Sequence, residues 1–280
     1  MEKYLLIAFM LFAPAAKQPL KPIVCCGKTA TEQFAAFASD PNFVKIHVLP
    51  ANFHYVPGAG ADIHFTASDG TPAHGYEFKA AKKTNNYLLL IHDYLGLGDY
   101  AKYESEKYFK SLKDVNVIAI DLYDNKSTTN PDSARKLMQA VTTVRATAII
   151  QGAIKMLGKD ARIGTIGWCF GGGWSLQTAL AAKEQTVACV VFYGMPEQDV
   201  TKLKTLHSDV LGIFANKDKW ITPAVVTGFE ENMKKAGKTL TVNSYDADHG
   251  FGNPNGPTHN ELAASDAYNK AEAYLHARFK

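Results

Sequence analysis

The sequence predicts one doubly wound α/β domain with a mostly parallel sheet and an antiparallel hairpin at its start. From residue 87 onward, short apolar runs alternate with stretches of helical character, the order expected of strands and helices in a parallel sheet. The apolar runs are continuous and do not alternate with polar residues, which indicates strands covered on both faces. The absence of internal repeats and of Pro/Ser-rich linkers favours a single domain.

Composition agrees with a folded soluble protein, with 280 residues of which 46% are apolar and 20% charged. A single domain of this length buries roughly 75% of its extended-chain surface, so a sizeable core is available. The net charge is only +3, and just four of the 30 basic residues are arginines. Because phosphate and base-edge recognition depends on clustered arginines, we expect no nucleic-acid partner.

The first fifteen residues have the order of a secretory signal peptide. Residues 1–3 carry charge, residues 4–13 are apolar, and Ala-Pro-Ala at 13–15 places small residues at the two positions that a signal peptidase inspects. The apolar run is too short for a stable membrane anchor. A buried N-terminal helix or a membrane tether is the alternative. We expect export to the periplasm or the extracellular space, with no membrane anchor after cleavage.

We divide the chain into a signal peptide at 1–15, an N-terminal arm at 16–60 and the α/β domain at 61–280. The arm contains a short helical piece around 31–38 and then Pro, Gly and Ala without a clear period, so we expect it to lie over the domain. Cys25 and Cys26 are adjacent in this arm. In an oxidising compartment they either cross-link the segment or remain without a role.

The elements of the domain are expected in the following order. The runs 62–67 and 74–80 form a hairpin, because the residues between them include the Asp-Gly step typical of tight turns. Further strands are expected at 87–91, 115–120, 162–166, 187–193, 210–214 and 239–245. Helices are expected at 100–112, 132–157, 172–182, 222–236 and 260–279.

The most informative segment follows the strand at 162–166 and reads Gly-Trp-Cys-Phe-Gly-Gly, with Cys169 as its cysteine. This is the pattern of a nucleophile elbow, in which glycines relieve crowding where a strand turns sharply into a helix. The positive end of the helix favours the thiolate of Cys169. We expect the backbone N–H groups of Phe170 and Tyr94 to form an oxyanion hole.

A cysteine nucleophile needs a base, and the base needs an acid to orient it. In hydrolases with this elbow the chain order is nucleophile, acid, histidine. Cys169, Asp218 and His249 follow three successive predicted strands in that order, so we predict that they form a catalytic triad. Asp246 and Asp248 are the second choice for the acid, because they lie beside the histidine in sequence.

We expect no metal and no cofactor. Asp246 and Asp248 resemble the start of a calcium loop, but Phe251 occupies the sixth position where that loop requires glycine. His64, His74 and His92 lie on or beside strands without a metal-binding spacing, and we interpret them as ordinary surface or core histidines. Cys189 lies in an apolar run and is expected to be a small buried side chain.

From about residue 75 to 279 the sequence resembles the dienelactone hydrolase family of the α/β-hydrolase superfamily. The resemblance implies the α/β-hydrolase fold and the opening of esters and lactones through an acyl-enzyme. It also implies the triad Cys169, Asp218 and His249. The segments that carry it are 90–97, 118–123, the elbow at Cys169, 192–194 and the loops of Asp218 and His249.

Two departures from the family limit the choice of substrate. Asp93 stands where the family has a glutamate that holds the resting thiol, so we treat it as an auxiliary residue of the thiol. Asn125 and Asn253 stand where the family's dienelactone-cleaving members have arginines for the substrate carboxylate, and Lys126 is the nearest basic residue in sequence. An anionic lactone is therefore disfavoured. The candidates for substrate contact are Asn125, Asn253, Lys126 and Tyr193.

The sequence thus predicts an exported, monomeric hydrolase that cleaves a small-molecule carboxylic ester or lactone through a Cys-His-Asp triad. Two alternatives remain open. One is a non-catalytic binding protein on a hydrolase fold, and the other is a thiol redox protein in which Cys169 cycles through a sulfenic acid.

Overall fold

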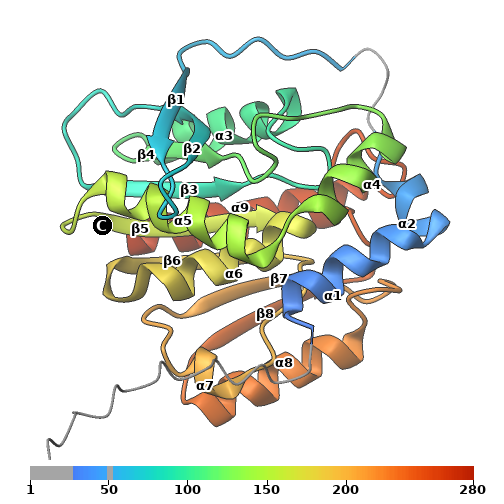
Figure 1. Cartoon of the computed structure of the whole chain (residues 1–280). Helices are drawn as coiled ribbons and strands as arrows, with labels where there is room; N and C mark the ends of the chain where they lie inside the picture. The colour runs from blue at the N-terminus through green and yellow to red at the C-terminus, as the bar shows by residue number, and fades with distance from the viewer. Residues whose placement is uncertain (1–27, 49–52) are drawn as a thin grey trace, which may run out of the picture.

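The computed structural model describes residues 28–48 and 53–280, and within them the chain forms one eight-stranded sheet (Figure 1). The order across the sheet is β1-β2-β4-β3-β5-β6-β7-β8. The first two pairings are antiparallel and all pairings from β3 with β4 to β7 with β8 are parallel. The predicted fold class is confirmed. The strands are β1 (Ala61–Thr66), β2 (Pro72–Phe78), β3 (Asn86–Ile91), β4 (Asn116–Ile120), β5 (Arg162–Trp168), β6 (Thr186–Phe192), β7 (Val210–Ala215) and β8 (Leu240–Tyr245).

Helices cover both faces of the sheet. Helices α5 and α6 pack on one face, and α3 and α9 pack together on the other (Figure 1). No helix of the described residues is both long enough and apolar enough to cross a membrane. The helices are α1 (Ala30–Ala36), α2 (Pro41–Ile46), α3 (Asp99–Leu112), α4 (Pro131–Ala140), α5 (Thr143–Leu157), α6 (Phe170–Ala182), α7 (Val200–Leu203), α8 (Pro223–Ala236) and α9 (Glu261–Arg278), with short 3₁₀ turns η1 (Phe37–Ser39) and η2 (Lys183–Gln185).

Burial along the strands explains the sequence pattern. The inner strands β4 and β7 are buried at every position, β5 and β6 at all but one position, and β3 at its last four positions. The edge strands β1 and β8 contain exposed residues, because each has only one neighbouring strand. Continuous apolar runs therefore mark the strands that the two helical layers enclose.

The structure divides the single helix expected at 132–157. Val141 adopts an extended conformation, and the Thr142 side chain accepts a hydrogen bond from the N–H of Arg145, so a new helix begins there. The expectation of one continuous helix was wrong. It rested on the helical spacing of apolar residues over 132–157, and that spacing does not reveal a helix start set by one capping threonine. Helices α2 and α7, of 6 and 4 residues, were also not predicted.

Residues 28–48 of the N-terminal arm are mostly helical and lie against the domain, whereas residues 53–60 contain no helix or strand. The helical part comprises α1, η1 and α2, which contact α4 and α6 (blue in Figure 1). Asp40 accepts a hydrogen bond from the indole N–H of Trp220 at 3.1 Å, and Ser39 one from Gln139 at 3.2 Å. Phe34 and Phe43 are buried. The expected signal peptide, Cys25 and Cys26 lie outside the described residues.

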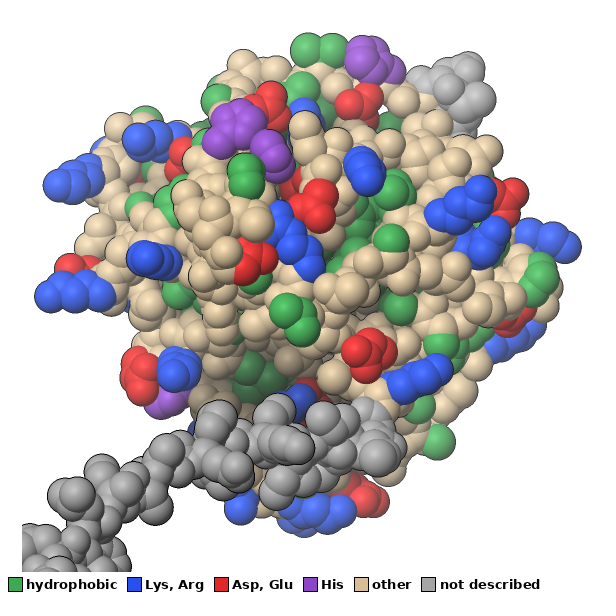
Figure 2. Space-filling view, viewed as in Figure 1, with side chains coloured by type: hydrophobic (Ala, Val, Ile, Leu, Met, Phe, Trp, Pro, Cys, Tyr) green, Lys and Arg blue, Asp and Glu red, His purple; other side chains and the backbone are tan. Residues whose placement is uncertain are grey.

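Charges of both signs are mixed on the face that Figure 2 shows. Lysine and arginine side chains are interspersed there with aspartate and glutamate. The described residues of this face form no continuous basic stripe of the kind with which proteins follow a nucleic-acid backbone.

The turn from β5 into α6 depends on glycines that allow backbone to meet backbone. A Cβ atom on Gly167 would lie 2.1 Å from the carbonyl oxygen of Gly171, and one on Gly171 would lie 2.2 Å from the carbonyl oxygen of Ile91. Both obstacles are main-chain atoms that cannot rotate away. A larger residue at Gly167 would push α6 away from β5, and a larger residue at Gly171 would push α6 away from the end of β3.

We predict that Gly167→Ala lowers the free energy of unfolding by at least about 2 kcal/mol, because the added methyl overpacks a rigid contact. Gly228→Ala is the matched control, since it lies within α8 and a Cβ there meets no atom within 4 Å. That control should stabilise by about 0.5–1 kcal/mol, as expected for Gly to Ala in a helix. Urea unfolding of both variants measures the difference, and equal stabilities would contradict the prediction.

Candidate active site

Cys169 lies at the tip of the turn between β5 and α6 in a conformation that side chains rarely adopt. Its φ is 59° and its ψ is −120°. Its N–H donates to the carbonyl of Phe192 at 3.0 Å, and its carbonyl accepts from the N–H of Gly172 at 3.1 Å. Strain of this kind costs on the order of 1–3 kcal/mol and persists only where the surroundings impose it. The turn therefore has the geometry of a nucleophile elbow.

Asp218 and His249 form a buried pair in the two loops that follow β7 and β8. Nδ1 of His249 lies 2.6 Å from one carboxylate oxygen of Asp218. The other oxygen accepts from the N–H groups of Trp220 and Ile221 at 2.8 and 2.9 Å. Burial opposes ionisation of Asp218, but His249 and these two N–H groups outweigh it and lower its pKa. The ionised carboxylate holds the proton of His249 on Nδ1 and leaves Nε2 free.

The other acids near the histidine in sequence do not hold it. Asp246 pairs with Lys217 at 3.0 Å on the surface, and no hydrogen bond joins Asp248 to His249. Among the described residues, Asp218 is the carboxylate that orients His249.

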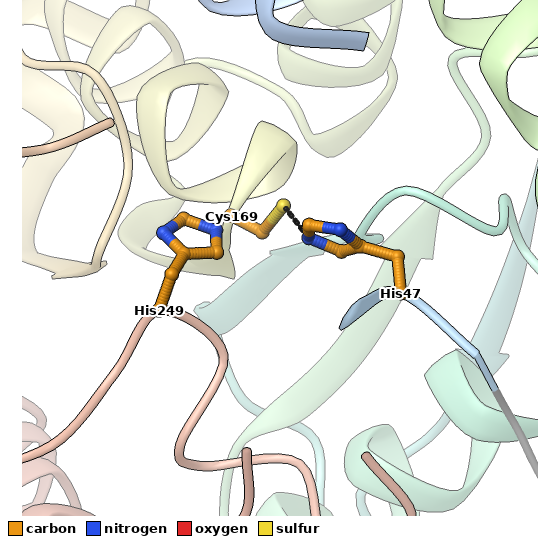
Figure 3. A group of neighbouring side chains, drawn as sticks. All are labelled: His47, Cys169 and His249. Carbon is orange, nitrogen blue, oxygen red and sulfur yellow. Dashed lines mark hydrogen bonds between the residues drawn. The ribbon is translucent and has the colours of Figure 1, made fainter. Parts of the chain in front are cut away.

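The free Nε2 of His249 faces the thiol of Cys169 without bonding to it. This nitrogen is buried and has no hydrogen-bond partner. It belongs to a group of three atoms, with Sγ of Cys169 and a ring nitrogen of His47, that all lie within 4.8 Å of one another. Figure 3 shows the thiol between the two imidazole rings.

His47, from the end of α2, makes the hydrogen bond to the thiol. Its Nε2 lies 3.1 Å from Sγ, and its Nδ1 lies 2.6 Å from the carbonyl oxygen of Phe43 (Figure 3). A carbonyl only accepts, so Nδ1 must carry the proton. Burial, followed by the nearness of His249, lowers the pKa of His47 to about 3, so the ring is neutral. The thiol of Cys169 therefore donates to Nε2 of His47.

The surroundings of Cys169 keep it as a neutral thiol at rest. Burial and the carboxylate of Asp93 raise its pKa well above the usual value for cysteine. The N–H groups of Phe170 and Tyr94 lie near the sulfur and lower the pKa of the thiol, against these two effects. These are the two donors predicted for the oxyanion hole, and the structure places both near Sγ of Cys169.

Asp93 lies at the end of β3 near the thiol and is partly buried. Its side chain accepts from the N–H of Leu95 at 3.0 Å. Burial raises its pKa to about 6, although the N–H groups of the loop act in the opposite direction. No hydrogen bond joins Asp93 to Cys169 among the described contacts, and His47 makes the contact with the thiol instead.

The four candidate substrate-binding residues lie in different places. The ring of Tyr193 packs against that of His249, with centroids 5.1 Å apart. Asn253 accepts from the N–H of Asn255 and so holds a turn of the His249 loop. Asn125 and Lys126 line a separate cavity of about 230 Å³ whose lining includes none of Cys169, Asp218 and His249. Of the four, only Tyr193 contacts a member of the predicted triad.

Aromatic side chains of the arm cover the site. The ring of Phe43 lies 5.7 Å from that of His249, 5.9 Å from that of Tyr94 and 5.2 Å from that of Trp220, measured between centroids. Cys169 is only 2% exposed and His249 1%. A cavity of about 280 Å³ lies between α2 and the loops of Trp220 and His249, and His249 is among its lining residues. Cys169 does not line this cavity, and the side chain of His249 is fully buried.

His47 was not among the residues predicted from the sequence. The arm was expected to lie over the domain, but a single histidine after an aromatic helical segment carries no motif. Its contact with Cys169 joins residues 122 positions apart, so only the folded chain reveals it. The nearest available signal in the sequence was the pair of phenylalanines, Phe34 and Phe43, in the arm. Large apolar side chains of this kind are usually buried, and the structure buries both against the domain.

A family model described as the dienelactone hydrolase family matches residues 74–279. The chain belongs to the dienelactone hydrolase family. The predicted family is confirmed, and with it the assignment to a family of hydrolases. The arm precedes the matched region, so the model does not include His47.

Three curated relatives of this family member show the extent of the sequence similarity. A "Putative carboxymethylenebutenolidase" of Saccharolobus solfataricus is 30% identical over 41% of this chain, and the match spans 44% of that relative. "Protein usf" of Aquifex pyrophilus is 27% identical over 67% of this chain and 86% of its own length. A protein of Aquifex aeolicus with the same description as the first is 25% identical over 62% of this chain and 79% of its own.

Solved structures share the fold of this dienelactone hydrolase family member. A dienelactone hydrolase-like promiscuous phosphotriesterase from metagenomic libraries superimposes with a TM-score of 0.68 at 18% identity, covering 80% of this chain and 100% of that chain. An esterase of Pyrococcus furiosus gives a TM-score of 0.59 at 13% identity, covering 82% of this chain and 100% of that chain. At these identities the similarity establishes the fold alone.

We predict that Phe43→Ala accelerates alkylation of Cys169 by iodoacetamide, because the ring holds α2 and His47 over the thiol. Mass spectrometry of the labelled peptide measures the rate. Phe229→Ala is the matched control, since Phe229 is equally buried but lies in α8. Equal labelling rates in the two variants would show that general destabilisation, and not release of the arm, exposes the thiol.

We predict that Asp93→Asn changes how stability depends on pH. The carboxyl has a pKa of about 6 when folded against an ordinary value of 3.8, so the folded chain holds its proton more tightly. The unaltered protein should therefore lose stability relative to the variant as pH rises from about 4 to about 6, by about 1–2 kcal/mol in this partly exposed position. Urea unfolding of both proteins at pH 4, 5, 6 and 7 gives the difference. A constant difference would contradict the raised pKa.

Proposed function

We propose that this protein hydrolyses a small carboxylic ester or lactone with Cys169 as the nucleophile. The observation that carries the proposal is the buried Asp218–His249 pair, whose free Nε2 faces a cysteine on a strained strand-to-helix turn. Membership in a family of hydrolases agrees with this chemistry. The names of the carboxymethylenebutenolidase relatives support a lactone or ester substrate.

Two histidines lie beside the thiol, and we assign the role of base to His249. A general base must become a stable cation when it takes the proton. His249 has the carboxylate of Asp218 at 2.6 Å to stabilise that cation. Nδ1 of His47 has only the carbonyl of Phe43 as its partner, so no carboxylate stabilises a cation on this ring. Burial lowers the pKa of His47 to about 3, so the ring cannot hold a second proton near neutral pH. His47 is therefore a positioning residue for the resting thiol.

In the proposed reaction the thiol turns from His47 to His249 and gives its proton to Nε2. The sulfur then bonds to the carbonyl carbon of the substrate, and the N–H groups of Phe170 and Tyr94 stabilise the oxyanion. The carbon–oxygen bond to the alcohol breaks, and His249 returns the proton to that oxygen. A thioester of Cys169 remains. Water, deprotonated by His249, attacks the thioester and releases the acid and the thiol.

Substrate must reach a thiol that the arm covers. The cavity beside His249 is bordered by Lys45 and Ile46 of α2 and by Lys217, Lys219 and Trp220 of the domain. We propose that substrate enters here and displaces α2 enough to meet Cys169. The expected preference against anionic lactones stays a prediction. The basic side chains that border this entrance act in the opposite direction, because they attract anions. Export and a monomeric state likewise remain part of the proposal.

The test is hydrolysis of activated esters and of neutral and anionic lactones by the full chain. We predict that Cys169→Ala lowers kcat/KM by at least about 1000-fold, as loss of a nucleophile does in comparable triads. Asp218→Asn should lower kcat with little change in KM, because it removes the orientation of His249 and leaves the pocket intact. Cys189→Ala is the matched control. It removes the other described cysteine, which is buried in β6 away from the site, and should keep the activity.

Full activity of Cys169→Ala would overturn the proposed mechanism. Absence of activity from the unaltered protein on the whole panel, with the circular dichroism of a folded chain, would favour a binding protein on this fold. Faster cleavage of anionic than of neutral lactones would contradict the preference expected from Asn125 and Asn253.

A further inference from the structure

Three potential metal-ligand atoms converge in the site from three distant parts of the chain. They are Nε2 of His47 at the end of α2, Sγ of Cys169 before α6, and Nε2 of His249 after β8 (Figure 3). All lie within 4.8 Å of one another. The proposed hydrolysis needs Cys169 and His249, but it does not explain why a second imidazole directs a nitrogen at the same sulfur.

The hydrogen bonding of this cluster is incomplete because one proton faces two acceptors. Nδ1 of His47 donates to the carbonyl of Phe43, and Nδ1 of His249 donates to Asp218. Each neutral ring thus directs a lone pair on Nε2 toward the thiol, which has a single proton. His47 receives it, and Nε2 of His249 is left buried without a partner. A buried nitrogen left without a hydrogen-bond partner destabilises the folded chain.

A divalent soft metal ion would satisfy all three atoms at once. Thiolate and imidazole are the ligands that Zn²⁺ prefers, and their outer N–H groups are usually held by a carboxylate or a carbonyl. Asp218 and the carbonyl of Phe43 already occupy those outer positions. Tetrahedral Zn²⁺ requires ligand atoms about 3.3–3.6 Å apart. The pair His47 and Cys169 is at 3.1 Å, so a shift of roughly 1 Å by His249 would complete the set.

We propose that Cys169, His47 and His249 form a binding site for Zn²⁺ or a similar thiophilic divalent ion, with a fourth position open to water. On binding, the thiol proton passes to solvent, one metal–sulfur and two metal–nitrogen bonds form, and no redox change occurs. The ion takes both the proposed nucleophile and its base, so the metal-bound form cannot carry out the proposed hydrolysis. It also holds α2 over the site, because His47 belongs to the arm. The sequence-based expectation of no metal is revised by this proposal.

Metal binding itself does not depend on the proposed hydrolysis, so the two can fail separately. The experiment titrates the full chain, freed of metal and carrying no affinity tag, with Co²⁺ and follows the absorbance. A sulfur-to-cobalt charge-transfer band together with intense visible bands reports a tetrahedral thiolate site. Zn²⁺ should displace the Co²⁺ and abolish the absorbance. We expect one Co²⁺ per chain, and a substrate assay on the same samples to show loss of hydrolysis with Zn²⁺ and its recovery with a chelator.

His47→Ala is the decisive variant because it removes a proposed ligand and leaves Cys169, Asp218 and His249 in place. We expect it to weaken Co²⁺ binding by more than about 10-fold, since loss of even an outer-shell partner has an effect of that size. His64→Ala is the matched control. His64 and His74 approach each other at 2.8 Å on the hairpin, where they form the other close histidine pair of the described residues. This variant should keep the charge-transfer band.

Cys169→Ser supplies a second, independent variant and should lose the charge-transfer band. Circular dichroism shows whether each variant is folded. Absence of the band in the unaltered protein would overturn the proposal, as would equal Co²⁺ affinity in His47→Ala. Visible Co²⁺ absorption without a charge-transfer band, lost in His64→Ala, would place the metal on the hairpin and would equally contradict the site proposed here. A metal-binding protein that hydrolyses no ester would disprove the proposed function alone.

Discussion

The close approach of main chain to main chain at the turn between β5 and α6 is the constraint on which the site depends. Gly167 and Gly171 allow the helix to start directly against the end of the strand, with no room for a methyl group at either. The chain can turn this sharply only if Cys169 takes a positive φ, which projects its thiol above the sheet edge. From that position the sulfur faces the N–H groups of Phe170 and Tyr94 and the loops that follow β7 and β8. The parallel order of the strands brings those loops to the same edge.

The thiol at this edge is shared between two histidines of different electrostatic character. His249 is supported by the ionised carboxylate of Asp218 and can become a cation. His47 is supported by a carbonyl and is held neutral by burial. At rest the thiol keeps its proton and donates it in a hydrogen bond to His47, which burial keeps from becoming a cation, so Cys169 is held as a neutral thiol. The arm that supplies His47 thereby links its own packing on the domain to the protonation state of Cys169.

Much of the domain could be predicted because its signals are local. Continuous apolar runs correspond to the enclosed strands, and Gly-Trp-Cys-Phe-Gly-Gly carries the requirements of the elbow in adjacent residues. Asp218 and His249 were expected from chain order alone, and the structure brings their side chains to 2.6 Å. The break between α4 and α5 was missed because the cap at Thr142 competes with an otherwise uninterrupted helical period. Asn125 and Lys126 were grouped with the site by alignment to a family pattern, yet they line a separate cavity.

The sheet, the elbow and the position of Cys169 could be predicted from the amino-acid sequence, because strand burial, turn geometry and glycine spacing act over a few neighbouring residues. The order in which Asp218 and His249 follow could be predicted as well. What the thiol contacts at rest depends on how distant parts of the chain pack together. That contact joins Cys169 to a histidine 122 residues earlier, on a short helix held by Phe34, Phe43 and Asp40 against the rest of the molecule. No local pattern encodes such a contact, because it forms only when the arm packs against the domain.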